Sequence, residues 1–108
     1  MQHTSLAQGR WFTFTLSAQL GNVGSEFERA VKWASANDVI RFESALARFL
    51  ELLDLTIADP RWIGCRRREL LRLRESAISA LLEDGTGSAQ EGLKKYFYYF
   101  AFAARTST

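Results

Sequence analysis

The chain has 108 residues, of which 47% are hydrophobic and 24% are charged, and its 14 Lys and Arg slightly outnumber its 12 Asp and Glu. The length fits one domain, and the hydrophobic content excludes an intrinsically disordered chain. The sequence shows no bilayer-spanning apolar run and no signal-peptide pattern after Met1, so we expect a cytoplasmic protein that does not enter a membrane.

The first thirteen residues are predicted to form an N-terminal tail. The alternation from Trp11 to Leu16 is also typical of a short β-strand, but nothing later in the sequence resembles a partner strand. We therefore predict a tail over residues 1–13, one helical-bundle domain over residues 14–105 and a C-terminal tail over residues 106–108.

A helical pattern begins at Leu16 and continues to about residue 36. Gly21 and Gly24 each cost about 1 kcal/mol relative to Ala inside a helix. Ser25 and Glu28 also form a capping box, so a break near Gly24 is the competing interpretation. Two glycines one turn apart let a neighbouring helix approach closely, and for this reason we predict one continuous helix. Its apolar face comprises Leu16, Leu20, Val23, Phe27, Ala30 or Val31, and Ala34.

Three more helices follow, separated by short connections. Asn37–Asp38 is a turn, because Asn tolerates the left-handed conformation and Asp caps the next helix. The second helix ends at Asp59–Pro60, since proline disfavours a helical conformation for the residue before it. A third helix is predicted over about 66–83, and Ser88 opens a fourth that reaches about Ala104. These elements predict an all-α, up-down four-helix bundle.

Six arginines cluster between residues 61 and 74, and two of them fall on the apolar side of the third helix. Arg67 and Arg74 lie seven residues apart among leucines, so they must be paired or reach solvent. Counting outward from the loops places Glu26 level with Arg74. The same counting places Gln19, and either Asp54 or Leu55, near Arg67. We name the five polar residues the polar seam: Gln19, Glu26, Asp54, Arg67 and Arg74. A structural network is the favoured interpretation, and a core pocket for a phosphate or carboxylate is the alternative.

The fourth helix carries six aromatic residues within seven positions: Tyr96, Phe97, Tyr98, Tyr99, Phe100 and Phe102. They surround the helix at about 100° per residue, whereas a small bundle buries only one stripe of a peripheral helix. We therefore predict an interface made by four of them, namely Tyr96, Tyr98, Tyr99 and Phe102. The same counting places Tyr98 and Tyr99 near Arg74. In the alternative interpretation, the N-terminal aromatic residues fold back over these rings within the same chain.

Six basic residues are candidates for contacts with the phosphates of RNA or DNA: Arg61, Arg66, Arg68, Arg72, Lys94 and Lys95. Basic runs are usually solvated helix faces, so nucleic-acid binding is the second interpretation of this chain. The distinguishing feature is whether these six residues share one exposed face.

The sequence shows no catalytic, metal-binding or cofactor-binding constellation. His3 is the only histidine, which excludes most histidine-based catalytic and metal sites. The segment Gly21–Gly24 lacks the lysine and the preceding strand of a phosphate-binding loop. Cys65 is the only cysteine, and an inert thiol is the favoured interpretation. We therefore expect neither an enzyme nor a cofactor or metal site.

Four segments resemble a group of small, uncharacterised prokaryotic helical proteins: Leu20–Glu26, Leu52–Ile57, Leu71–Glu75 and Lys95–Phe97. The resemblance covers most of the chain and implies a helical fold without an activity. The predicted architecture is also similar to that of bundle proteins encoded by ribosomal RNA intervening sequences and of accessory proteins of diversity-generating retroelements. Nuclease domains of the HEPN type need a histidine after an arginine, and no histidine follows any arginine here.

These patterns together favour a non-enzymatic accessory subunit or interaction module. We expect it to form a homo-oligomer or to dock on a protein partner through its fourth helix. An RNA- or DNA-binding accessory protein is the alternative, and an enzyme that uses the polar seam ranks third.

Overall fold

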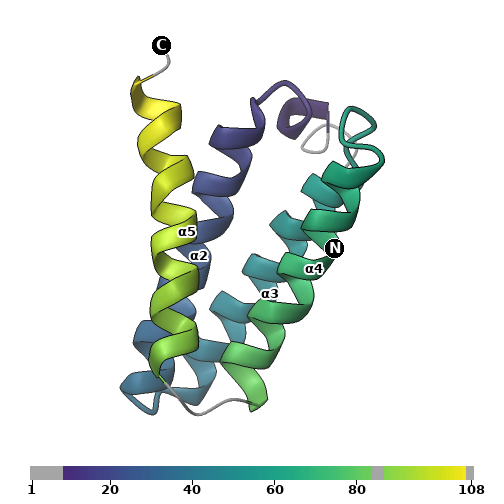
Figure 1. The fold of residues 1–108 in the computed structure, drawn as a ribbon. Coiled ribbons are helices and arrows are strands. Elements are labelled where there is room, and N and C mark those ends of the chain that lie inside the picture. Colours follow the sequence, from purple (N-terminus) through teal and green to yellow (C-terminus); the bar gives the residue numbers. More distant parts are fainter. Residues whose placement is uncertain (1–8, 84–86, 107–108) are drawn as a thin grey trace.

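The computed structural model describes residues 9–83 and 87–106. Four long helices run alternately up and down: α2 (Leu16–Ser35), α3 (Val39–Ile57), α4 (Cys65–Ile78) and α5 (Gly87–Thr106), shown in Figure 1. A π-helical turn, η1 (Ser79–Glu83), extends α4. The described residues contain no β-strand. The predicted all-α four-helix bundle is therefore confirmed.

Helix α2 is continuous through both of its glycines, as predicted. It begins after Thr15, whose side chain accepts a hydrogen bond from the Ala18 amide at 3.1 Å and so caps the helix. The Ser25 hydroxyl donates to the carbonyl of Gly21 instead of capping a second helix. The competing interpretation, a break near Gly24, is wrong.

The turn between α2 and α3 follows its sequence signals. Asn37 has a φ of 58°, a left-handed conformation that Asn adopts more easily than most residues. The Asp38 carboxylate accepts from the Arg41 amide at 3.1 Å and caps α3. Helix α3 then ends at Ile57, just before Asp59–Pro60, as predicted.

The connection between α3 and α4 spans residues 58–64 and ends at a glycine with a positive φ. Gly64 has a φ of 62° and a ψ of −129°, which only glycine adopts without strain, and it directly precedes Cys65. The third helix, predicted over about 66–83, begins at Cys65 and consists of two parts, α4 and the π-helical turn η1. Helix α5 begins at Gly87, one residue before the predicted start at Ser88.

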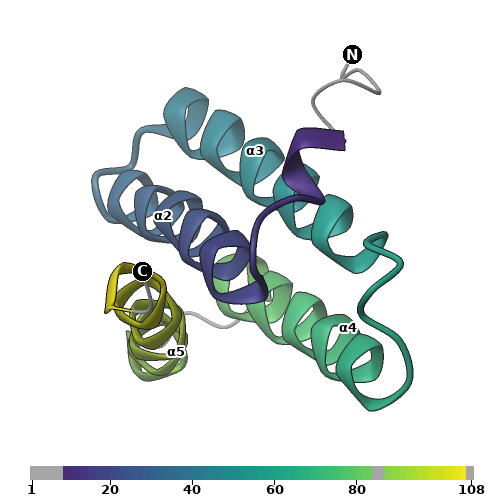
Figure 2. The ribbon, with the colours of Figure 1, turned by 90° about the horizontal axis from the view of Figure 1, so that it is seen from above.

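Helix α2 is central to the bundle, because it packs against both α3 and α5 (Figure 2). Three aromatic rings join these helices in the core, with ring centroids 5.5–6.2 Å apart: Phe27, Phe49 and Phe97. Large aliphatic side chains complete the centre of this core: Leu20, Val23, Leu53 and Leu70. These side chains, which come from α2, α3, α4 and α5, form one hydrophobic core.

Two glycines set the distance between α2 and α5. A Cβ placed on Gly24 would lie 2.3 Å from Phe97 Cβ, and one placed on Gly21 would lie 3.0 Å from the Ala101 Cα. No side chain fits at Gly24 without moving α5. The prediction that these glycines admit a neighbouring helix is confirmed, and the neighbour is α5.

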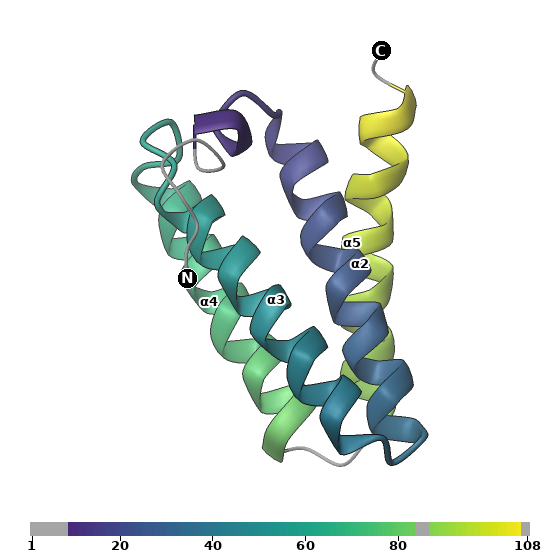
Figure 3. The ribbon, with the colours of Figure 1, turned by 180° about the vertical axis from the view of Figure 1, so that it is seen from behind.

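The helix pair α2–α5 diverges from the pair α3–α4 toward the end that carries residues 9–15 (Figure 3). Residues 9–11 are helical, and Trp11 is buried in the core. The Trp11 indole N–H donates to Thr56 Oγ1 at 3.0 Å, and its ring packs edge-on against Phe14. The tail predicted for residues 1–13 is thus wrong at its last residues, because a buried tryptophan that finds a hydrogen-bond partner fills this end of the bundle.

Within residues 9–83 and 87–106, no helix combines the length and the apolar character needed to cross a bilayer.

Candidate functional site

Three large rings on α5 face away from the core, and we name them the aromatic face: Tyr98, Tyr99 and Phe102. Their exposed fractions are 64%, 66% and 50%. Large aromatic residues are enriched at protein interfaces and are otherwise mostly buried. The aromatic face is therefore the most unusual surface in the described part of the chain.

The aromatic face exists because α5 is packed on one side only. Phe97 is the one fully buried residue of α5, and Leu93 and Phe100 are half-buried beside it. At about 100° per residue, Phe102 and Tyr99 project to the side opposite Phe97. Phe97 therefore fills the core, whereas Tyr98 and Phe102 are exposed.

Tyr96 differs from the other predicted interface residues. Its ring packs against Phe97 and Phe100, and its hydroxyl lies 3.4 Å from Glu69 Oε2 on α4. Burial, followed by the nearby Glu69 carboxylate, raises the pKa of the Tyr96 hydroxyl. Tyr96 therefore helps to pack α5 toward α4 and is not part of the exposed aromatic face.

The N-terminal aromatic residues in the described part of the chain do not cover this face. Trp11 bonds to Thr56 on α3, and Tyr98, Tyr99 and Phe102 remain exposed. The predicted alternative, in which residues 10–16 fold over these rings, is therefore wrong. The predicted position of Tyr98 and Tyr99 near Arg74 is wrong too, because α5 packs on α2 and Arg74 bonds to α3.

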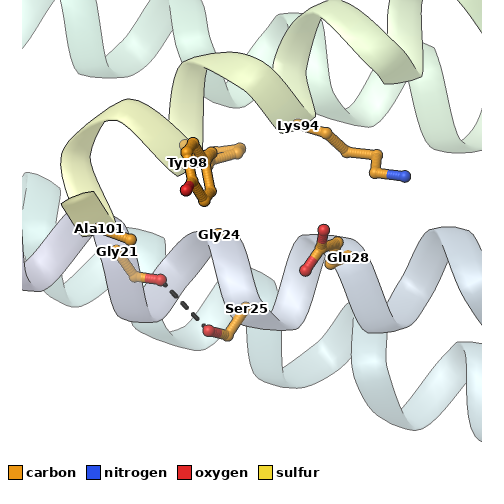
Figure 4. A pocket seen from close by; sticks show the side chains of 8 residues that line it. Gly21, Gly24, Ser25, Glu28, Lys94, Tyr98 and Ala101 are labelled. Atoms are coloured by element: carbon orange, nitrogen blue, oxygen red, sulfur yellow. Dashed lines mark hydrogen bonds between the residues drawn. The ribbon is translucent and has the colours of Figure 1, made fainter.

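A small cavity lies beside Tyr98, between α2 and α5 (Figure 4). Gly21 and Gly24 form its floor, and Glu28 and Lys94 stand at its rim. Its volume is about 60 Å³, whereas a cavity of roughly 150 Å³ is needed to hold a benzene ring. This cavity is thus too small for an aromatic ligand.

The polar seam does not form with the predicted pairs. Arg74 Nε donates to Asp54 Oδ1 at 2.8 Å, so Arg74 pairs with Asp54 and not with Glu26. Arg67 is exposed, so its predicted approach to Gln19 and Asp54 is wrong too. The error is one of register: Asp54 and Arg74, which pair between α3 and α4, both lie ten residues from Gly64.

Glu26 bonds within its own helix, to Arg29 Nη1 at 2.7 Å. Glu26 and Arg48 line one groove between α2 and α3. We expect Glu26→Ala to lower the free energy of unfolding by less than about 1 kcal/mol, because its partner Arg29 is well solvated. Urea denaturation measures this loss, and a loss of several kcal/mol would show that Glu26 holds a buried charge.

A polar cluster that the sequence analysis missed lies at the end of the bundle where the two helix pairs diverge. The Gln19 side-chain amide is fully buried; it donates to Asp59 Oδ2 at 2.9 Å and to the Trp11 carbonyl at 3.0 Å. The Trp62 indole N–H donates to Gln19 Oε1 at 2.8 Å. Every polar atom of this side chain therefore has a partner. Gln19 alone of the seam residues is a central element of a buried network.

Asp59 holds the second half of this cluster. The Arg61 guanidinium donates to both of its carboxylate oxygens and to the Phe14 carbonyl at 2.6 Å. Chiefly through this guanidinium, the pKa of the Asp59 carboxyl falls from 3.8 to about 2, although burial acts in the opposite direction. The cluster ties residues 11–14, α2 and the α3–α4 connection together, and this is a structural role.

The six candidate nucleic-acid contacts are spread over different surfaces. Arg61 is bonded to Asp59, Arg66 to Glu69 and Lys94 to Glu91. Lys94 lines a groove with Arg29 and Lys32, on the side of α2. Arg68 and Arg72 line another groove, on α4, and Lys95 is exposed on α5. Among these six residues, only Arg68 and Arg72 line a groove together.

Candidate metal ligands do not gather in the described residues. No group of three His, Cys, Asp or Glu in residues 9–83 and 87–106 could hold a metal ion. Cys65 is exposed at the start of α4. His3 lies outside the described residues. The aromatic face is therefore the best candidate functional site.

In comparisons with known proteins, no family model, curated protein or solved structure matches this chain.

Proposed function

We propose that this chain is a non-enzymatic interaction module, which docks on protein through the aromatic face of α5. The observation that carries the proposal is the joint exposure of Tyr98, Tyr99 and Phe102 on a helix with one buried side. Complete burial of an aromatic side chain removes roughly 150–250 Å² from water. Half to two thirds of each of these residues is still exposed, so a partner surface would gain from covering all three.

Electrostatics at the ends of the face also suit a protein partner. Glu91 and Lys95 precede the rings and Arg105 follows them, so both signs of charge border an apolar centre. An apolar centre with a charged, solvated rim is the usual anatomy of a protein interface.

The proposal is tested with the paired substitutions Tyr98→Glu and Phe102→Glu. We expect the variant to fold with a stability within about 0.5 kcal/mol of wild type, because both side chains are exposed. In an extract of its native cells, wild type should elute as a species larger than its 12.3 kDa monomer, and the variant at the monomer position.

The matched control is Val39→Glu with Ile40→Glu on α3, where the exposed fractions are 64% and 80%. This control introduces the same charge and removes comparable exposed apolar surface away from α5. It should elute with wild type. Equal elution of wild type and the α5 variant would contradict the proposal, as would an equal effect of the control.

A further inference from the structure

We infer that the occupant of the aromatic face is a second copy of this chain, with the two α5 helices packed antiparallel about a two-fold axis near Tyr98. The inference rests on the proposed function and adds the identity and the orientation of the partner. It follows from the order of side chains along the exposed side of α5.

Positions that recur at alternating spacings of four and three form one stripe along a helix, the arrangement used for helix pairing. On α5 one such stripe contains Glu91, Lys95, Tyr98, Phe102 and Arg105. All five residues are exposed in the structure. This stripe has an aromatic centre and charged ends. It extends along most of α5, so another helix can pair with it.

Charge decides the orientation of two such helices. In a parallel pair, each Glu91 would face Glu91 of the second copy. Each Lys95 and each Arg105 would likewise face the same residue of the second copy. Like charges across an interface are destabilising. An antiparallel pair avoids all three repulsions.

The antiparallel arrangement also brings complementary groups together. Tyr98 lies seven residues from both Glu91 and Arg105, so an axis at Tyr98 places Glu91 opposite Arg105 of the second copy. The same axis brings Phe102 beside the exposed Lys95 of the second copy, whose ammonium group can lie over the ring. Such a surface is complementary to itself, which a two-fold interface requires.

The close packing of α5 on α2 supports a stable platform for this contact. Gly21 and Gly24 fix α5 against α2, and Phe97 anchors it in the core. The rings therefore project from a rigid helix, which lowers the ordering cost of association.

Sedimentation equilibrium of the purified full chain tests the stoichiometry. We expect a dimer, and we expect Tyr98→Glu with Phe102→Glu to raise its dissociation constant by at least about 30-fold, the usual minimum for central aromatic contacts. A wild type that stays monomeric at up to about 1 mM overturns the inference. It leaves the proposed function standing if the elution shift in extract still depends on α5.

Disulfide trapping tests the orientation, in a Cys65→Ser background that removes the exposed native thiol. We expect a mixture of Glu91→Cys and Arg105→Cys chains, one of them carrying a size tag, to form the mixed disulfide and little of either symmetric one. Predominant symmetric disulfides would overturn the antiparallel arrangement. Glu43→Cys, on the exposed side of α3, is the control and should remain uncoupled.

Discussion

Gly24→Ala should lower the free energy of unfolding by about 3 kcal/mol or more, although alanine favours helices more than glycine does. The new Cβ would lie 2.3 Å from Phe97 Cβ and 2.8 Å from Phe97 Cγ. These atoms are the stem of a buried ring, so they move only if α5 moves. Urea denaturation followed by circular dichroism measures the loss.

Gly92→Ala is the matched control, because a Cβ on Gly92 of α5 meets nothing within 4 Å. It should raise the free energy of unfolding by about 0.5–1 kcal/mol through helix propensity alone. Opposite signs for the same substitution in two helices would establish the close approach of α2 and α5. A stabilising Gly24→Ala would contradict that packing.

Asp59→Ala is expected to cost about 2–4 kcal/mol. Its carboxylate is 1% exposed and accepts from Gln19 and Arg61, so its loss leaves a buried amide without one partner. Arg61 is 41% exposed and regains water, which keeps the cost below that of a fully buried pair. The control Asp54→Ala removes an exposed partner of Arg74 and should cost less than about 1 kcal/mol. Equal losses in urea denaturation would contradict the distinction between the two carboxylates.

The same carboxylate predicts a dependence of stability on pH. Its folded-state pKa of about 2 lies below the ordinary 3.8, so the charged form stabilises the fold. This contribution, about 2 kcal/mol, is complete above about pH 5 and is lost as the pH falls through the folded-state pKa of about 2. Asp59→Asn should therefore show a smaller loss of stability than wild type over that range. Parallel curves for the two proteins would show that Asp59 is not stabilised as a carboxylate.

The fold could be predicted from the sequence because its signals are local. Asn37 and Asp38 adopt the turn and capping geometries that their side chains favour, and Asp59–Pro60 follows the end of α3. The spacing of Gly21 and Gly24 indicated the close approach of another helix but could not name α5.

The pairing of polar side chains could not be predicted, because it depends on register. Arg74 pairs with Asp54 on α3 and not with Glu26 on α2, and counting residues outward from a loop does not fix how two neighbouring helices are aligned. The contacts of Gln19 with Trp11 and Asp59 join segments far apart in the sequence, and no spacing signal connects them.

The exposed rings of the candidate site could be predicted more fully, since six aromatic residues on one helix exceed what one buried stripe can hold. Tyr96 was the exception. Its position toward α4 depends on the packing of α5 against its neighbours, and its hydroxyl then reaches Glu69.

Photo-crosslinking in living cells tests most directly whether the aromatic face contacts protein. Benzoylphenylalanine placed at Tyr99 presents a reactive ring at the centre of the face, and the same residue at Glu43 on α3 is the control. We expect a covalent adduct with protein from position 99 and none from position 43, and an adduct of twice the chain mass would identify the second copy. Equal or absent crosslinking at the two positions would contradict the assignment of α5 as the interaction surface.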